Sequence, residues 1–233
     1  MRHSWRWGVV LAAAAICVAC TGDGSGGLPD PDFLLHDAVA ASTGVRTAHV
    51  DLQTSGQVPG LAVRSLDANV VAPRDDSPGA AEGTATVTLG GGPVTVRFVE
   101  TDGRILVDTG GGHYVPPPTA TEQLPRPSVL LDPDAGLGAT LASLQGAQTV
   151  VREDVDGTTA FKVTGSVPGD VVARLLPGVA PEETPMAVWF DVKGRHAPVK
   201  SELTVADGSG GTSTLTLRMS DANRPVEISA PPT

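Results

Sequence analysis

Apolar and polar residues alternate along most of the chain after residue 47, which predicts β-strands. Ala48, Val50 and Leu52 form one apolar row of this kind. In each such segment one side of the alternation is apolar and the other is Thr, Arg or Asp, which is typical of an antiparallel sheet with one wet face. The expected strands are 48–53, 63–71, 84–89, 94–98, 105–107, 149–153, 159–163, 186–192, 199–206 and 212–220, with 226–228 as a candidate edge strand.

Turn signals separate these segments. Asp102-Gly103 and Asp156-Gly157 are typical of tight β-hairpins. By contrast, residues 110–127 contain two proline clusters that exclude a helix interior or a central strand. Because a compact domain seldom keeps so long an irregular stretch without a use, we expect it to border a binding site.

Helical spacing of apolar residues occurs in three short segments. It predicts helices over 33–42 with Asp32 as N-cap, over 137–144 behind Asp134, and over 170–176. Few helices beside many strands indicate an α+β fold.

Gly136 and Gly138 weaken the second of these helices, by about 1 kcal/mol each relative to Ala. Either they admit another backbone or a ligand at close range, or packing simply tolerates them. The run Asp132-Pro133-Asp134 begins like a calcium loop, but the twelfth position is Ser143, which cannot supply a bidentate carboxylate. We therefore interpret Asp134 as a helix cap.

An apolar run from Trp7 to Ala19 follows Arg2 and Arg6, as in a signal peptide, and is too short to span a membrane. It ends in Val18-Ala19-Cys20, which resembles a bacterial lipobox whose cysteine receives a diacylglyceryl group. The alternative is an ordinary secretory signal with a stray cysteine. On the lipobox interpretation residues 1–19 are the signal, 20–31 are lipidated Cys20 and a Gly-rich flexible tether, and 32–233 are a single domain.

Charge limits the partners of the chain. The sequence has 16 Lys+Arg and 26 Asp+Glu, a formal net charge of −10. This balance argues against nucleic acid and against flat adsorption to anionic membranes. Attachment to a membrane would therefore depend on acyl chains at Cys20.

Candidate catalytic chemistry is scarce in the sequence. The five histidines are scattered, and no HExxH, Walker loop, GxSxG or CxxC motif occurs. Aromatic residues make up 3% of the chain, too few for a sugar-stacking or base-stacking surface. We expect neither an enzyme nor a bound metal or cofactor.

Several motifs together resemble a known family. They are Leu28-Pro29-Asp30, Pro59-Gly60-Leu61, Thr88-Leu89-Gly90-Gly91, Asp102-Gly103, the run from Leu131 to Leu137, Val188-Trp189, Leu215-Thr216-Leu217 and Pro225-Val226. In order and spacing they resemble the actinobacterial lipoproteins LppX, LprA, LprF and LprG, most of all the LprG members. The segment 221–223 departs from the aromatic residue expected there.

The resemblance implies a strongly curved antiparallel sheet, a half-barrel similar to the periplasmic carriers LolA and LolB. Short helices on its concave side would enclose an apolar cavity. It also implies an exported protein, anchored on the outer, periplasmic face of the cell membrane, that binds acylated glycolipids or triacylglycerols and carries them between membranes. A membrane lipid exporter is a further partner it suggests.

Small side chains on the apolar sheet face would leave volume for such a ligand. The expected cavity lining is Ala85, Val87, Leu89, Val94, Val96, Phe98, Leu137, Leu141, Val188 and Phe190. Small residues also pack well, so a filled core is the alternative. Two functions follow: a lipid carrier, or a non-enzymatic structural or signalling surface lipoprotein.

Overall fold

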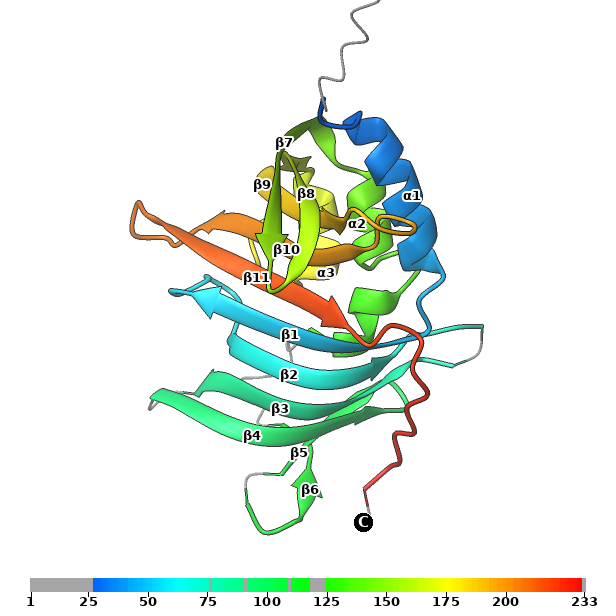
Figure 1. Cartoon of the computed structure of the whole chain (residues 1–233). Helices are drawn as coiled ribbons and strands as arrows, with labels where there is room; N and C mark the ends of the chain where they lie inside the picture. Colours follow the sequence, from blue (N-terminus) through cyan, green and yellow to red (C-terminus); the bar gives the residue numbers. More distant parts are fainter. Residues whose placement is uncertain (1–26, 76, 90–91, 109, 118–124, 232–233) are drawn as a thin grey trace, which may run out of the picture.

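The computed structural model describes residues 27–231 except 76, 90–91, 109 and 118–124. It contains one open, strongly curved antiparallel sheet of eleven strands (Figure 1). Across the sheet the order is β6-β5-β4-β3-β2-β1-β11-β10-β9-β8-β7. The strands are β1 (Thr47–Ser55), β2 (Val63–Val71), β3 (Ala80–Leu89), β4 (Gly92–Thr101), β5 (Arg104–Asp108), β6 (Tyr114–Val115), β7 (Gln145–Val155), β8 (Thr158–Val167), β9 (Thr184–Asp191), β10 (Pro198–Ala206) and β11 (Thr212–Ser220).

The pairing of β1 with β11 joins the two halves of this sheet. Leu52 lies opposite Leu217 at the seam, and β1 also pairs with β2 in the same antiparallel sense. One half therefore contains β1–β6 and the other β7–β11. The expected α+β fold with a curved, open antiparallel sheet is confirmed.

Within the described residues, four short helical segments pack on one side of the sheet (Figure 1). They are α1 (Pro31–Thr43), the 3-10 helix η2 (Pro127–Leu131), α2 (Leu137–Ala142) and α3 (Gly169–Leu175). Their apolar residues join the inner face of the sheet in one contiguous core. The alternation of apolar and polar residues thus places one row of each strand inside.

Two helix caps differ from expectation. Asp30, not Asp32, is the N-cap of α1: its Oδ1 accepts the Asp32 N–H at 2.8 Å, and Pro31 occupies the first helical position. Similarly, Asp132 Oδ1 accepts the N–H groups of Asp134 and Ala135. The N-cap of α2 is Gly136, so Asp134 is not a cap, and the helix ends before Leu144.

The glycines of α2 admit protein backbone and a neighbouring helix. A Cβ on Gly136 would lie 2.6 Å from three carbonyl oxygens, and a Cβ on Gly138 would lie 3.2 Å from the Ser42 side chain of α1. Close approach of other parts of the chain therefore accounts for both positions.

The candidate edge strand at 226–228 is not formed, and residues 224–231 are irregular. Asn223 accounts for this change of direction. Its N–H donates to the Thr47 carbonyl at 2.8 Å, and its Oδ1 accepts the Arg46 N–H at 2.7 Å. These bonds end the pairing of β11 and turn the chain away from the sheet.

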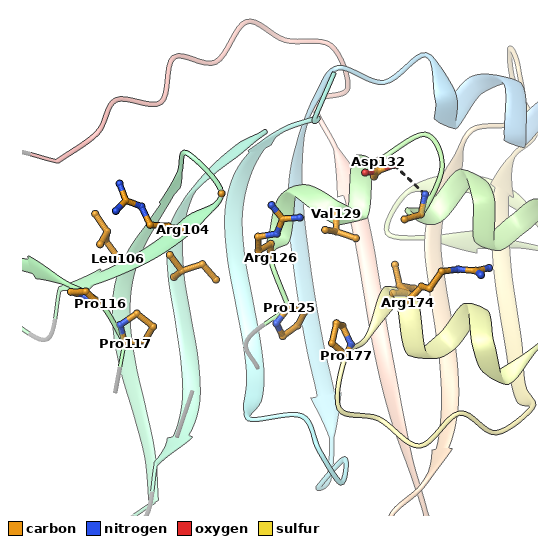
Figure 2. Close-up of a pocket in the computed structure, with 14 residues that line it drawn as sticks. Arg104, Leu106, Pro116, Pro117, Pro125, Arg126, Val129, Asp132, Arg174 and Pro177 are labelled. Carbon is orange, nitrogen blue, oxygen red and sulfur yellow. Dashed lines mark hydrogen bonds between the residues drawn. The ribbon is translucent and has the colours of Figure 1, made fainter. Parts of the chain in front are cut away.

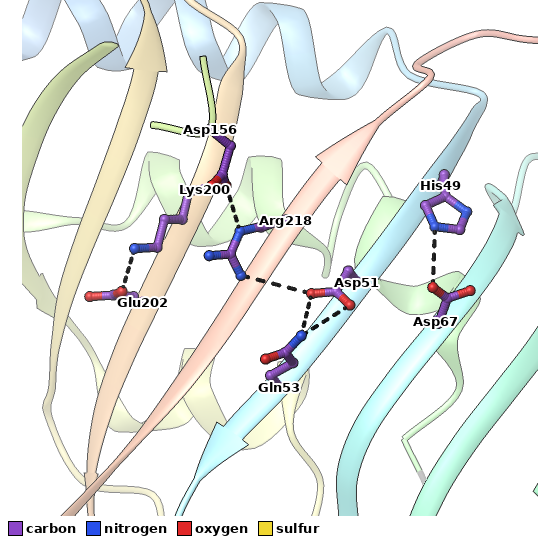
Figure 3. Close-up of polar contacts among 8 residues, drawn as sticks. All are labelled: His49, Asp51, Gln53, Asp67, Asp156, Lys200, Glu202 and Arg218. Carbon is purple, nitrogen blue, oxygen red and sulfur yellow. Dashed lines mark hydrogen bonds and ion pairs between the residues drawn. The ribbon is translucent and has the colours of Figure 1, made fainter. Parts of the chain in front are cut away.

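The outer face of the sheet carries polar side chains (Figure 3). Arg218 contacts Asp156 at 2.9 Å and Asp51 at 3.8 Å, while Lys200 contacts Glu202 at 2.7 Å. The contacts of Arg218 join three parts of the chain, β1, β11 and the β7–β8 turn, whereas Lys200 and Glu202 both belong to β10. Such partly exposed ion pairs contribute little stability individually, so the apolar inner face must supply most of it.

Candidate functional site

An open groove of about 760 Å³ runs between the outer strands of the first half and α3 (Figure 2). One wall is formed by the β4–β5 turn, β5 and the residues after β6. The opposite wall is formed by residues 125–131, which we call the strap, together with the end of α3. The lining residues are Gly103, Arg104, Ile105, Leu106, Pro116, Pro117, Pro125, Arg126, Val129, Asp132, Ala135, Arg174, Leu175 and Pro177.

The strap is attached to the sheet by a buried carboxylate. Glu100 of β4 is fully buried, and it accepts the Ser128 hydroxyl at 2.5 Å and the Ser128 N–H at 2.9 Å. Burial raises the pKa of Glu100, while the bonds from Ser128 and the charge of Arg126 act in the opposite direction. These two buried bonds hold the middle of the strap, while Arg74 donates to the Leu131 carbonyl at its end.

The outer wall is ordered by a second carboxylate. Asp108, at the end of β5, accepts the N–H groups of Gly110 at 2.8 Å and Gly112 at 3.2 Å and pairs with Arg97. The bond from Gly110, helped by Arg97 and Gly112, lowers the pKa of Asp108. The turn that leads into β6 is therefore held to the sheet.

Two narrow clefts lie beneath the strap. One, of about 30 Å³, is lined by Val63, Leu66, Ala85, Val87, Val96, Phe98, Ile105, Val107, Pro125 and Pro127. The other, of about 40 Å³, is lined by Leu52, Leu61, Val63, Leu66, Pro125, Arg126, Pro127, Leu130, Leu175 and Leu176. Pro125 lines all three spaces, so the strap lies between the groove and both clefts, together with Ile105 at the first cleft and Leu175 at the second. Each cleft is large enough for one or two water molecules.

The structure brings four of the expected lining residues together. Ala85 and Val87 of β3 lie beside Val96 and Phe98 of β4, and all four line the first cleft. Val94 is 42% exposed and lies outside these spaces. The side chain of Leu89 is outside the described residues.

Four other expected residues are in the filled half of the protein. Leu137 and Leu141 of α2 and Val188 and Phe190 of β9 are buried in the core. They line neither the groove nor the two clefts. The space is narrower than the single enclosed cavity expected, because the strap and the end of α3, with Leu175 and the following Leu176, line and narrow it.

Sequence reasoning did not identify the polar part of the groove. Arg104, Arg126 and Arg174 line it, and they come from three separate elements. The irregular stretch 110–127 was expected to border a binding site, and four of its residues line the groove: Pro116, Pro117, Pro125 and Arg126. The three arginines lie far apart in the sequence and form no motif. Only the fold brings them to one groove.

Other site types find little support. Within residues 27–231, apart from the gaps, no cluster of three or more His, Cys, Asp or Glu side chains is arranged to hold a metal. Among the helices described, none is long and apolar enough to cross a membrane. Cys20 and the segment 1–26 lie outside the described residues.

The fold and the groove together define a class of protein, an open curved antiparallel sheet with a strap and short helices over its concave face. Residues 30–228 match the family described as LppX_LprAFG lipoprotein. The chain belongs to this family, which confirms the resemblance seen in the sequence.

Relatives of known name match the chain over nearly its whole length. It is 29% identical over 238 residues to the lipoarabinomannan carrier protein LprG of Mycobacterium leprae, covering 99% of this chain and 97% of the relative. It is 30% identical over 229 residues to the protein of that name from Mycolicibacterium hassiacum, covering 95% and 94%.

Solved structures agree on the fold. LprF from Mycobacterium bovis superposes with a TM-score of 0.73 at 24% identity and covers 88% of this chain and 99% of that chain. The Mycobacterium tuberculosis lipoprotein LppX gives a TM-score of 0.63 at 24% identity and covers 86% and 100%. At this level of identity the likeness concerns architecture alone.

Proposed function

We propose that this chain is a non-enzymatic lipoprotein of the cell envelope that binds acylated lipids and carries them between membranes. The observation that carries the proposal is the groove and the two apolar clefts beside it, with the strap lying between them. The groove volume of about 760 Å³ is typical of ligand sites, which are usually about 300–1,000 Å³. The lipoarabinomannan carriers among its relatives support the same role.

Loading of an acyl chain requires the strap to move. The clefts below it hold about 30 and 40 Å³ and are far too narrow for a fatty acyl chain. Displacement of residues 125–131 would join the clefts to the groove and expose Ala85, Val87, Val96 and Phe98 to the ligand. Burial of an acyl chain favours this opening, because each CH₂ contributes about 0.8 kcal/mol.

The ligand is a glycolipid or triacylglycerol type of acylated lipid. Transfer between membranes can be measured with donor vesicles that contain a fluorescent acylated lipid and acceptor vesicles that contain none. Addition of the full chain should accelerate transfer in proportion to its concentration. A rate equal to that without protein would refute the carrier role.

Membrane attachment in this proposal depends on Cys20. Lipidation there would anchor an exported protein on the outer, periplasmic face of the cell membrane, where a membrane lipid exporter could supply its ligand. Cys20→Ala should release the protein from membranes and move it from the detergent phase to the aqueous phase. Partition of the alanine variant into detergent would contradict lipidation at this residue.

A second candidate function is a structural or signalling surface lipoprotein. The filled core of the β7–β11 half and the narrowness of the clefts favour it. It predicts that the purified protein retains no lipid and accelerates no transfer, so the vesicle experiment separates the two functions.

A further inference from the structure

The largest exposed apolar side chains lie at one end of the domain. Among the described residues, the exposed large apolar side chains are four valines and two larger residues, Leu28 and Phe33. Leu28 is 43% exposed and lies three residues before α1, and Phe33 is 54% exposed and lies in its first turn. Both therefore belong to the end of the domain that follows Cys20 in the chain.

Phe33 is held in its exposed position by a turn of the sheet. The β9–β10 turn (192–197) carries His196, whose ring contacts the Phe33 ring edge-on with 5.6 Å between centroids. The His196 ring also lies 6.5 Å from the ring of Phe161 in β8. Phe33 is not among the buried residues of α1. These aromatic contacts thus fix an apolar side chain that the core does not use.

The same turn adds cationic side chains. Lys193 and Arg195 are exposed, and among the described side chains none forms an ion pair with either. The carboxylates of Asp30 and Asp191 instead accept backbone N–H groups, of Asp32 at 2.8 Å and of Lys193 at 2.9 Å. Long basic side chains can lay their stems along apolar surface while their charged ends meet polar groups, which suits the headgroup layer of a membrane.

The length of chain before α1 limits where this end of the domain can lie. Leu28 follows Cys20 by eight residues. Eight residues span at most about 28 Å when fully extended, whereas a compact domain of about 200 residues is roughly 40 Å across. With acyl chains on Cys20 in a bilayer, the start of α1 must stay close to that bilayer. By contrast, β5 and β6 lie at the other end of the molecule (Figure 1).

We propose that the start of α1 and the β9–β10 turn form a membrane-docking surface, in which Leu28 and Phe33 enter the phospholipid bilayer that holds the acyl chains of Cys20. Leu and Phe beside Lys and Arg are typical of surfaces that lie at the boundary between headgroups and acyl chains. This inference rests on the Cys20 anchor in the proposed function. Docking holds the filled half of the sheet against the membrane and leaves the β5 wall of the groove facing away from it.

The test uses tryptophan as a probe of depth. Phe33→Trp places the probe in the docking surface. Val94→Trp is the matched control, because Val94 is 42% exposed and belongs to β4, which lies away from α1 (Figure 1). Each lipoprotein is purified from membranes as the full processed chain. It is then reconstituted in phosphatidylcholine vesicles with either brominated or ordinary acyl chains, and the wild-type protein supplies the background of its native tryptophans.

We expect brominated acyl chains to quench the Phe33→Trp signal at least twofold, and the Val94→Trp signal no more than the background. Equal quenching of both probes would overturn the docked orientation. So would vesicle-bound protein whose Phe33→Trp probe is not quenched, and this result would leave the anchor in place. Wild-type protein that does not float with the vesicles would refute the anchor on Cys20 and the docking with it.

A second variant tests Leu28 with the same probe. Leu28→Asp added to Phe33→Trp should reduce the quenching at least twofold, because a carboxylate is costly in the apolar part of a bilayer. The control is Val150→Asp added to Phe33→Trp, at a position that is 44% exposed on β7, and it should leave the quenching unchanged. Equal effects of the two aspartates would contradict entry of Leu28 into the membrane.

Discussion

The two halves of the sheet bury their inner faces in different ways. In the β7–β11 half, α1 and α2 cover the strands with large side chains, and Leu34, Leu141 and Phe190 are almost completely buried. In the β1–β6 half, the inner face carries the small residues Ala48, Ala68, Ala81 and Ala85, and a single strap covers much of it.

This difference separates stability from function within one sheet. Helices that interdigitate with a sheet at crystal-like density leave no room for a ligand. A proline-containing strap held by a few hydrogen bonds at Ser128 and Leu131 leaves clefts and a groove. The filled half can therefore hold the curvature of the sheet while the other half changes its packing.

Removal of a large core side chain should produce the greatest difference in stability between the two halves of the sheet. Phe190→Ala in the filled half should lower the free energy of unfolding by about 3–5 kcal/mol. Phe98→Ala borders a cleft, where the strap can collapse into the space, and should cost at least about 1 kcal/mol less. Chemical denaturation of both variants measures the two values. Equal costs would mean that the halves are equally well packed.

Introduction of a large side chain should also destabilise the filled half more than the first half. Ala38 of α1 is fully buried in the filled half, and Ala38→Trp should cost about 3 kcal/mol, at the upper end for overpacking. Ala85→Trp should cost less than about 1 kcal/mol, because the strap can shift outward. Thermal melting of the two variants provides the comparison. A larger loss of stability from Ala85→Trp than from Ala38→Trp would contradict the view that the first half can change its packing.

The smallest expected effect concerns Glu100 under the strap. Its pKa is raised in the folded protein from an ordinary value of 4.5. As pH rises above that value the unfolded chain loses this proton first, so the folded state binds more protons and stability falls until the raised pKa is passed. Glu100→Gln should abolish this fall. The pH-dependent change in the free energy of unfolding should then differ between wild type and variant by an amount on the order of 1 kcal/mol, comparable with one net hydrogen bond. The free energy of unfolding of both proteins is measured between pH 4 and 8, and parallel curves for wild type and variant would contradict this role of Glu100.

The strands were predictable because their alternation is local. The segments 63–71 and 212–220 match β2 and β11 in both bounds. Helix starts were less predictable. Aspartates stand close together before both helices, and which of them accepts the backbone N–H groups depends on local backbone geometry. The acceptors are Asp30 and Asp132, not the expected Asp32 and Asp134.

The candidate site was only partly predictable. Ala85, Val87, Val96 and Phe98 lie together because neighbouring strands place them on one face. Which half would be filled depends on how the helices pack with one another and on the sheet, and this is a property of packing between distant segments. For that reason Leu137, Leu141, Val188 and Phe190, equally apolar in the sequence, lie in solid core.

The amount of lipid retained by the full chain and by its Ala85→Trp variant tests the central claim most directly. Both proteins are purified from cells that supply their own lipids, and bound lipid is quantified after extraction alongside thermal melting. The wild-type protein should retain acylated lipid, and the variant should retain several-fold less with nearly unchanged melting. Unchanged lipid content with lowered stability would show that Ala85 belongs to a packed core and that acyl chains do not occupy the space beneath the strap.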